Sequence, residues 1–245
     1  MFWNVIDSGR MAPQAIMAKD AQLLDQLGML TKPVLHFYEW EGSCLTYGYF
    51  TDPLKYLKKS ALEKHQLLMA RRPTGGGIIF HLTDFAFSVL VPASSPWFSL
   101  NTLENYKLVN QLTAQAIEHL FNQSITPQLL DLTTACADQP CVPFCMAKPT
   151  QYDLMFQGKK LGGAAQRRTK NGFLHQGSIS ISLPPSQLLQ DVLKDSKVVE
   201  AMQETTYTLM ESPAEEDLYA VRQALKQQLG RLDFKGNSAM IFSVS

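Results

Sequence analysis

The sequence lacks an apolar run of the roughly 18 residues needed to cross a bilayer, so no membrane span is predicted. Its opening residues lack the basic region, apolar stretch and small-residue cleavage site of a secretory signal, so we expect a cytoplasmic protein. It also lacks net charge, because 22 Lys and Arg residues balance 22 Asp and Glu residues. That balance removes any general attraction to nucleic acid or to an anionic membrane and leaves electrostatic recognition to a local patch.

Cysteine is scarce: the 245 residues contain only Cys44, Cys136, Cys141 and Cys145. Four cysteines are too few to cross-link a chain of this length, so we expect free thiols in a reducing compartment. The spacing of the last three does not match the Cys-x-x-Cys pattern of zinc sites, and no fourth ligand is evident. We therefore predict no metal site.

The composition, 45% apolar and 18% charged, is typical of a folded domain with a proper core. We predict a single domain over 1–245. Hydrophobic spacing predicts helices at 14–27, at 102–121 with Asn101 or Thr102 as cap, and after Ser212 as N-cap, with Gly230 ending the last helix. Predicted strands cover 34–40, 43–49, 66–71, 78–81, 85–91, 152–156 and 173–183. Strands clustered on both sides of one long helix favour an α+β fold, with 184–245 as a helical cover on the same domain.

Three adjacent glycines mark the run Arg71-Arg72-Pro73-Thr74-Gly75-Gly76-Gly77, which leads into Ile78-Ile79-Phe80-His81. Glycines weaken a strand, so they indicate a backbone that approaches a ligand or takes positive φ. The two arginines could bind an anion, and the apolar residues could hold an apolar tail. A flexible hairpin loop is the alternative, and the P-loop pattern is absent. His81 is as consistent with a structural role as with a catalytic one.

Five basic residues and no acidic residue occur in the run 159–170. A solvated basic loop is one interpretation. The small residues at 162–165 favour another, in which the backbone packs against a ligand while Lys160 points its ammonium at a carboxylate, phosphate or developing oxyanion. Arg167 and Arg168 could instead meet an acidic protein partner.

Cys145 lies in a loop bounded by Pro143 and Pro149, just before a predicted strand and near the basic run. A lone cysteine is most often a small buried apolar group. The thiolate is the nucleophilic form, and a nearby cation favours it. Cys145 is therefore a candidate nucleophile.

Two motifs together resemble the lipoate–protein ligase and octanoyltransferase family, which shares a catalytic fold with biotin–protein ligases. The run 71–77 with His81 is similar to the family's acyl-binding loop, and the run 158–166 is similar to its catalytic-lysine motif. The motifs lie about 85 residues apart in the family's order. Runs 2–9, 35–40, 47–50 and 172–179 resemble further segments, so the resemblance covers most of the chain.

The resemblance implies mixed and antiparallel sheets packed with helices. It implies transfer of an octanoyl or lipoyl group to a lysine of a lipoyl domain, such as the glycine-cleavage H protein or a 2-oxoacid dehydrogenase subunit. Lys160 matches the catalytic lysine. The substrate-binding positions that we predict are Arg71, Arg72, Thr74, Gly75, Gly76, Gly77, His81, Gly162, Gly163 and Ala164.

The family has two branches. Its ligases activate the free acid with ATP and Mg²⁺, whereas its cysteine-dependent octanoyltransferases need no nucleotide and take the acyl group from acyl carrier protein or another carrier. Cys145 stands seven residues before Tyr152, which resembles the spacing of the octanoyltransferase nucleophile. About 60 residues follow the run 172–179, fewer than we expect for an added ligase domain.

We therefore predict a Cys145 thioester, with Lys160 stabilising the carbonyl oxygen during transfer. The alternatives are an ATP-dependent ligase with a structural Cys145, and a non-catalytic accessory subunit that binds an acyl group or a lipoyl domain. Three positions depart from the family pattern. The family commonly has arginine where this chain has His36, aspartate where it has Leu82, and histidine where it has Gln176. These positions bear on substrate and nucleotide preference and leave Lys160 and the glycine run intact.

Overall fold

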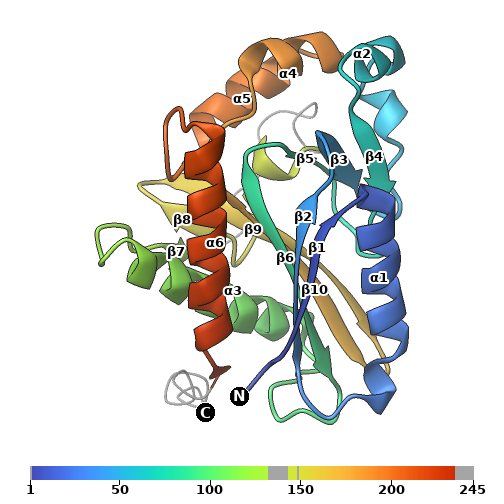
Figure 1. Cartoon of the computed structure of the whole chain (residues 1–245), viewed down its shortest axis with the longest axis vertical. Coiled ribbons are helices and arrows are strands. Elements are labelled where there is room, and N and C mark those ends of the chain that lie inside the picture. Colours follow the sequence, from blue (N-terminus) through green and yellow to red (C-terminus); the bar gives the residue numbers. More distant parts are fainter. Residues whose placement is uncertain (1, 132–142, 148, 235–245) are drawn as a thin grey trace.

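The computed structural model describes residues 2–131, 143–147 and 149–234, which form two β-sheets with helices packed against them (Figure 1). In spatial order, the seven-stranded sheet contains β1 (Asn4–Met11), β2 (Val34–Trp40), β6 (Asp84–Pro92), β10 (Gly172–Ser180), β9 (Lys159–Thr169), β8 (Leu154–Phe156) and β7 (Gln128–Leu129). The three-stranded sheet contains β4 (Leu68–Arg71), β3 (Cys44–Tyr47) and β5 (Ile78–His81). The pairs β1–β2 and β3–β4 are parallel, and the other pairs are antiparallel. The predicted α+β fold with mixed sheets is confirmed.

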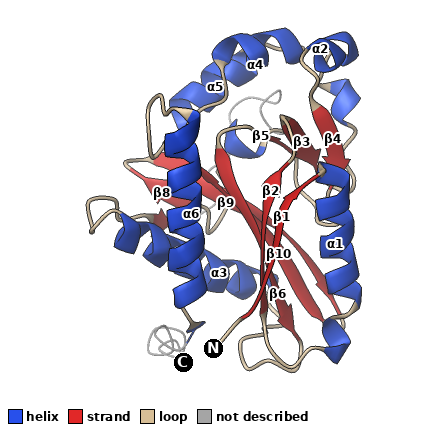
Figure 2. Ribbon diagram, in the orientation of Figure 1, coloured by secondary structure: helices blue, strands red, loops and turns tan. Residues whose placement is uncertain are grey.

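Helices cover both faces of the large sheet (Figure 2). Because side chains alternate along a strand, β2 sends Leu35 and Phe37 to one face and Val34 and Tyr38 to the other. The first face packs against α3 (Thr102–Leu120) and α6 (Glu215–Arg231), and the second packs against α1 (Pro13–Asp25). This double coverage explains why every residue of β6 and β10 is buried.

A second apolar cluster lies over the small sheet, beneath α2 (Lys59–Lys64), α4 (Ser186–Val192) and α5 (Lys197–Thr205). It includes Phe144 and Met146, which flank Cys145 in the 3-10 helix η4 (Cys145–Ala147). The backbone of Ile78 donates to the carbonyl of Pro143 at 2.6 Å, which joins this segment to β5. The second core therefore fixes the position of Cys145. Two further 3-10 helices, η1 (Leu27–Met29) and η2 (Pro53–Lys55), follow α1 and β3 in the chain.

The start of α3 agrees with the sequence, whereas both ends of α6 differ from it. Asn101 accepts a hydrogen bond from the backbone of Leu103 and starts α3, as predicted. The prediction for α6 is wrong at both ends, because the helix starts at Glu215 and runs through Gly230 to Arg231. Its N-cap is Ala214, whose N–H donates to the Asp217 carboxylate at 3.1 Å.

The basic run is a strand, β9, so its interpretation as a solvated loop is wrong. Small residues have low strand propensity, but residues Gly162 to Thr169 pair in unbroken register with β10. Strand β1 was also not predicted; it pairs with β2 along a largely exposed edge. None of the helices in the described ranges is long and apolar enough to cross a membrane.

Candidate active site

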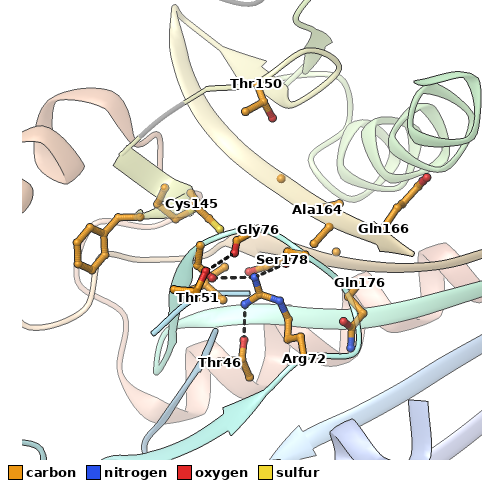
Figure 3. Close-up of a pocket in the computed structure, with 18 of the residues that line it drawn as sticks. Thr46, Thr51, Arg72, Gly76, Cys145, Thr150, Ala164, Gln166, Gln176 and Ser178 are labelled. Atoms are coloured by element: carbon orange, nitrogen blue, oxygen red, sulfur yellow. Dashed lines mark hydrogen bonds between the residues drawn. The ribbon is translucent and has the colours of Figure 1, made fainter. Parts of the chain in front are cut away.

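A cavity of about 790 Å³ opens between the two sheets (Figure 3). Its wall combines apolar residues of β2 and β5 with the glycine turn before β5, the small residues of β9, and η4. The predicted site residues on this wall are Arg72, Gly75, Gly76, Gly77, His81, Cys145, Lys160, Gly163 and Ala164. Arg71, Thr74 and Gly162 do not line it.

Arg72 is buried and holds the glycine turn from within. Its guanidinium donates to the hydroxyl of Thr46 at 2.8 Å and to the carbonyls of Gly75 and Gly77 at 3.0 and 2.8 Å. Gly76 takes a φ of +85°, where a side chain would strain the backbone. Arg72 was predicted to bind an anion, but these N–H groups donate to the protein and hold the turn in its shape.

Gly77 is required by close packing against the backbone that leads into η4. A Cβ at this position would lie 2.0 Å from the carbonyl oxygen of Pro143. The turn thus brings the β5 strand and the Cys145 segment into direct backbone contact. Gly76 takes the positive φ that the sequence predicted, whereas the close approach at Gly77 is to the protein backbone. Hydrogen bonds from Gly48, Tyr49 and Thr51 hold the turn in place.

His36 and Gln176, two of the positions that depart from the family pattern, both contact the buried carboxylate of Asp20. Oδ1 of Asp20, in α1, lies 2.7 Å from Nδ1 of His36. Oδ2 of the same carboxylate accepts from Nε2 of Gln176 at 2.6 Å and from the Ser88 hydroxyl at 2.7 Å. Gln176 in turn accepts from the hydroxyl of Thr74 at 2.7 Å. Thr74 therefore connects the glycine turn to α1 and β2 rather than contacting the cavity.

His81 has partners at both ring nitrogens. Nδ1 lies 2.7 Å from Oδ2 of Asp84, and Nε2 lies 2.7 Å from the hydroxyl of Thr46. The ring also stacks on Trp40 with centroids 4.3 Å apart. Burial alone would raise the pKa of Asp84, but the charge and hydrogen bond of His81 hold it below its ordinary value. These contacts favour the structural interpretation of His81.

Lys160 is 3% exposed, and its ammonium lies inside the wall of the cavity. Nζ is 2.6 Å from Oδ2 of Asp153 and donates to the carbonyl oxygen of Cys145 at 2.7 Å. A Cβ at Gly163 would lie 2.7 Å from Cε and 2.8 Å from Nζ of this lysine. The small residue thus leaves the space that the lysine side chain occupies.

Cys145 is partly exposed and faces the glycine turn. Figure 3 shows its sulfur pointing toward Gly76, and a Cβ built on Gly76 would lie 3.8 Å from Sγ. The same Cβ would lie 3.6 Å from the Ala165 side chain of β9. The thiol, the lysine and the glycine turn, which are far apart in the sequence, therefore surround one cavity.

Comparison with known proteins agrees with this arrangement. Residues 12–230 match the family described as lipoyl protein ligase A/B catalytic domain. The chain belongs to this family. The predicted family is therefore confirmed. Relatives named Octanoyltransferase LipM include one from Lysinibacillus sphaericus, 33% identical over 190 residues that span 76% of this chain and 68% of the relative. Another, from Bacillus subtilis, is 31% identical over 204 residues, 82% of this chain and 73% of the relative.

Solved structures support the fold of this lipoyl protein ligase A/B catalytic domain. A crystal structure of lipoate-protein ligase A bound with ATP has a TM-score of 0.67 and 20% identity, covering 94% of this chain and 86% of that one. LipL1 of P. falciparum in complex with lipoate has a TM-score of 0.65 and 19% identity, covering 96% of this chain and 63% of that one.

Sequence reasoning missed Asp153 and Asp20, the two carboxylates that organise the site of this family member. Asp153 could have been found, because a short hairpin across Gly158 pairs β8 with β9 and brings it near Lys160. It also missed Tyr106 of α3, which lines the cavity and whose pKa burial raises to about 12. Tyr106 is therefore a neutral phenol in the wall.

The described residues contain no cluster of three or more His, Cys, Asp or Glu side chains placed to hold a metal ion. Cys136 and Cys141 of the rejected zinc pattern lie outside the described residues.

Proposed function

We propose that this chain is a cysteine-dependent octanoyltransferase, with Cys145 as the nucleophile and Lys160 as the assisting cation, and that 1–245 act as one catalytic domain. One observation carries the proposal: the thiol of Cys145 and the ammonium of Lys160 border the same partly apolar cavity beside a close-packed glycine turn. The name shared by the relatives from Lysinibacillus sphaericus and Bacillus subtilis supports the same activity.

In the first step, the Cys145 thiolate attacks the carbonyl carbon of an acyl thioester. A new carbon–sulfur bond forms, the old one breaks, and the donor leaves as a thiol after taking up a proton. In the second step, the ε-amine of an acceptor lysine attacks the enzyme thioester. An amide forms, the proton lost by the amine passes to the cysteine sulfur, and the free thiol is restored.

Lys160 stabilises the oxyanion that forms in both steps. Its ammonium already donates to the main-chain carbonyl of Cys145 at 2.7 Å, so it lies beside the reacting segment. Loss of a positioned donor of this kind typically costs about 3 kcal/mol of transition-state stabilisation, or more than a hundredfold in rate. Asp153 keeps the ammonium oriented.

No nucleotide enters this scheme. Exchange between two thioesters is nearly balanced in free energy, and amide formation from a thioester is favourable, so ATP and Mg²⁺ are not needed. We propose octanoate as the transferred group, acyl carrier protein as donor, and lipoyl domains such as glycine-cleavage H protein or a 2-oxoacid dehydrogenase subunit as acceptors.

Intact-mass measurement after incubation with octanoyl carrier protein tests the proposal. We expect one octanoyl adduct that hydroxylamine removes and that Cys145→Ser prevents, with Cys44→Ser as the matched control because that thiol is buried. The ligase alternative instead predicts ATP-dependent formation of an acyl-adenylate that survives Cys145→Ser. The accessory-subunit alternative predicts binding of a lipoyl domain without modification of it.

A further inference from the structure

An exposed group of aromatic and basic side chains lies beside the cavity. Arg71 of β4 lies over the ring of Tyr49 at 4.6 Å, and Arg167 of β9 lies over the same ring at 5.7 Å. The ring of Phe50 is 5.1 Å from that of Tyr49 and 93% exposed. We call Tyr49, Phe50, Arg71 and Arg167 the arginine–aromatic patch.

The patch adjoins the entrance to the site. Phe50 lines the cavity itself, although its ring is almost wholly exposed. Arg167 donates to the carbonyl of Pro73, which only Thr74 separates from the glycine turn. A partner that covers the patch therefore also covers the route to Cys145.

The charge of the patch points to an acidic partner. Two guanidinium groups from different sheets converge on one ring, in a chain whose overall charge is zero. Asp52 is an acidic residue beside Phe50, but its carboxylate accepts from the backbone of Leu54 and caps η2. Exposed aromatic rings with arginines are also the composition that protein interfaces favour.

We propose that the arginine–aromatic patch docks the acidic carrier protein that delivers the acyl thioester, with Arg71 and Arg167 binding the phosphodiester of its thioester arm. Guanidinium groups bind phosphate oxygens in paired, charge-assisted hydrogen bonds. They repel the ammonium of an acceptor lysine, so the patch fits the donor better than the acceptor. This inference rests on the proposed octanoyltransferase activity.

The test compares two donors in single-turnover acylation of Cys145. Octanoyl carrier protein presents the acidic surface and the phosphodiester, whereas octanoyl-N-acetylcysteamine presents neither. In Arg71→Glu/Arg167→Glu, we expect acylation by the carrier protein to slow at least about tenfold and to lose its dependence on salt, with the small thioester unaffected. The double variant Arg10→Glu/Lys32→Glu makes the same change in charge at exposed residues outside the patch and should leave both rates unchanged.

Three results would overturn the docking proposal: equal slowing with both donors, no slowing with either, or slowing confined to transfer from the acyl-enzyme to a lipoyl domain. The last result would assign the patch to the acceptor. Absence of a Cys145 thioester in the unaltered protein with either donor would instead refute the proposed function, so the two failures can be distinguished.

Discussion

The ammonium of Lys160 lies 2.6 Å from Oδ2 of Asp153, and these two side chains are only 3% and 2% exposed. Thr150 also donates to this carboxylate oxygen through its N–H and its hydroxyl, at 2.6 and 2.9 Å. A buried charge is tolerated only when it is paired and hydrogen-bonded. The lysine that we propose to be catalytic therefore also contributes to the stability of the fold, and its removal affects more than the reaction.

Asp153→Asn should reduce activity and stability together, because it leaves the Lys160 ammonium buried without its counter-ion. We expect a loss of about 3 kcal/mol in the free energy of unfolding. Lys160→Ala should lose stability as well, since it leaves the buried Asp153 carboxylate without its counter-ion. The double variant Asp153→Asn/Lys160→Gln should recover much of the stability but none of the activity. Urea unfolding beside a lipoyl-domain assay measures both quantities, and a fully active Asp153→Asn enzyme would refute the positioning role.

Gly163→Ala should displace the lysine without adding or removing charge. The new methyl carbon would lie 2.7 Å from Cε and 2.8 Å from Nζ of Lys160, so the side chain must move. Misplacement of a catalytic group by about 1 Å costs on the order of a hundredfold in rate. The matched control is Gly230→Ala, near the end of α6, where no atom apart from the adjacent residues and the helix's own backbone lies within 4 Å of the new carbon. That variant should keep full activity and gain up to about 1 kcal/mol of stability.

Asp20→Asn should disturb the glycine turn through Gln176. Gln176 and Ser88 donate to Oδ2, and Nδ1 of His36 lies against Oδ1. An amide replaces one of these oxygens by an NH₂ group, so either the two donors face another donor or His36 must accept rather than donate at Nδ1. A loss of about 2 kcal/mol in the free energy of unfolding is expected. Asp25→Asn, on the exposed side of the same helix, should change stability by less than about 0.5 kcal/mol. Equal effects of the two changes would contradict the role given to Asp20.

Folding stability should fall in mild acid because of His175. Complete burial lowers the pKa of this histidine to about 3, from an ordinary value of 6.5. Between these values the unfolded chain binds a proton that the folded chain does not, so the free energy of unfolding decreases as the pH falls from 6.5 toward 3. The slope contributed by one such group is at most about 1.4 kcal/mol per pH unit. Urea titrations at pH 7.0 and 5.5 should give a smaller difference in the free energy of unfolding between the two pH values for His175→Gln than for the unaltered protein.

The sequence predicted the elements with strong periodicity and the residues with unusual chemistry. One example is the helix capped by Asn101. Another is the expectation that Lys160 lies near the glycine run, since both line the same cavity. It did not predict that 159–169 form a strand, because that strand depends on its pairing with β10 rather than on its own small residues. Nor could it show that His36 and Gln176 meet on Asp20, since that contact joins three elements distant in sequence.

A chase of isolated octanoyl-enzyme shows whether the Cys145 thioester itself donates the acyl group. Protein loaded with octanoate on Cys145, freed of donor and of nucleotide, is mixed with an unmodified lipoyl domain, and the masses of both proteins are followed over time. We expect the octanoyl mass to leave the enzyme and to appear on the lipoyl-domain lysine at equal rates, on the order of a hundredfold slower with Gly163→Ala. An acyl-enzyme that persists, or a lipoyl domain that is modified only when ATP and free octanoate are supplied, would contradict this expectation.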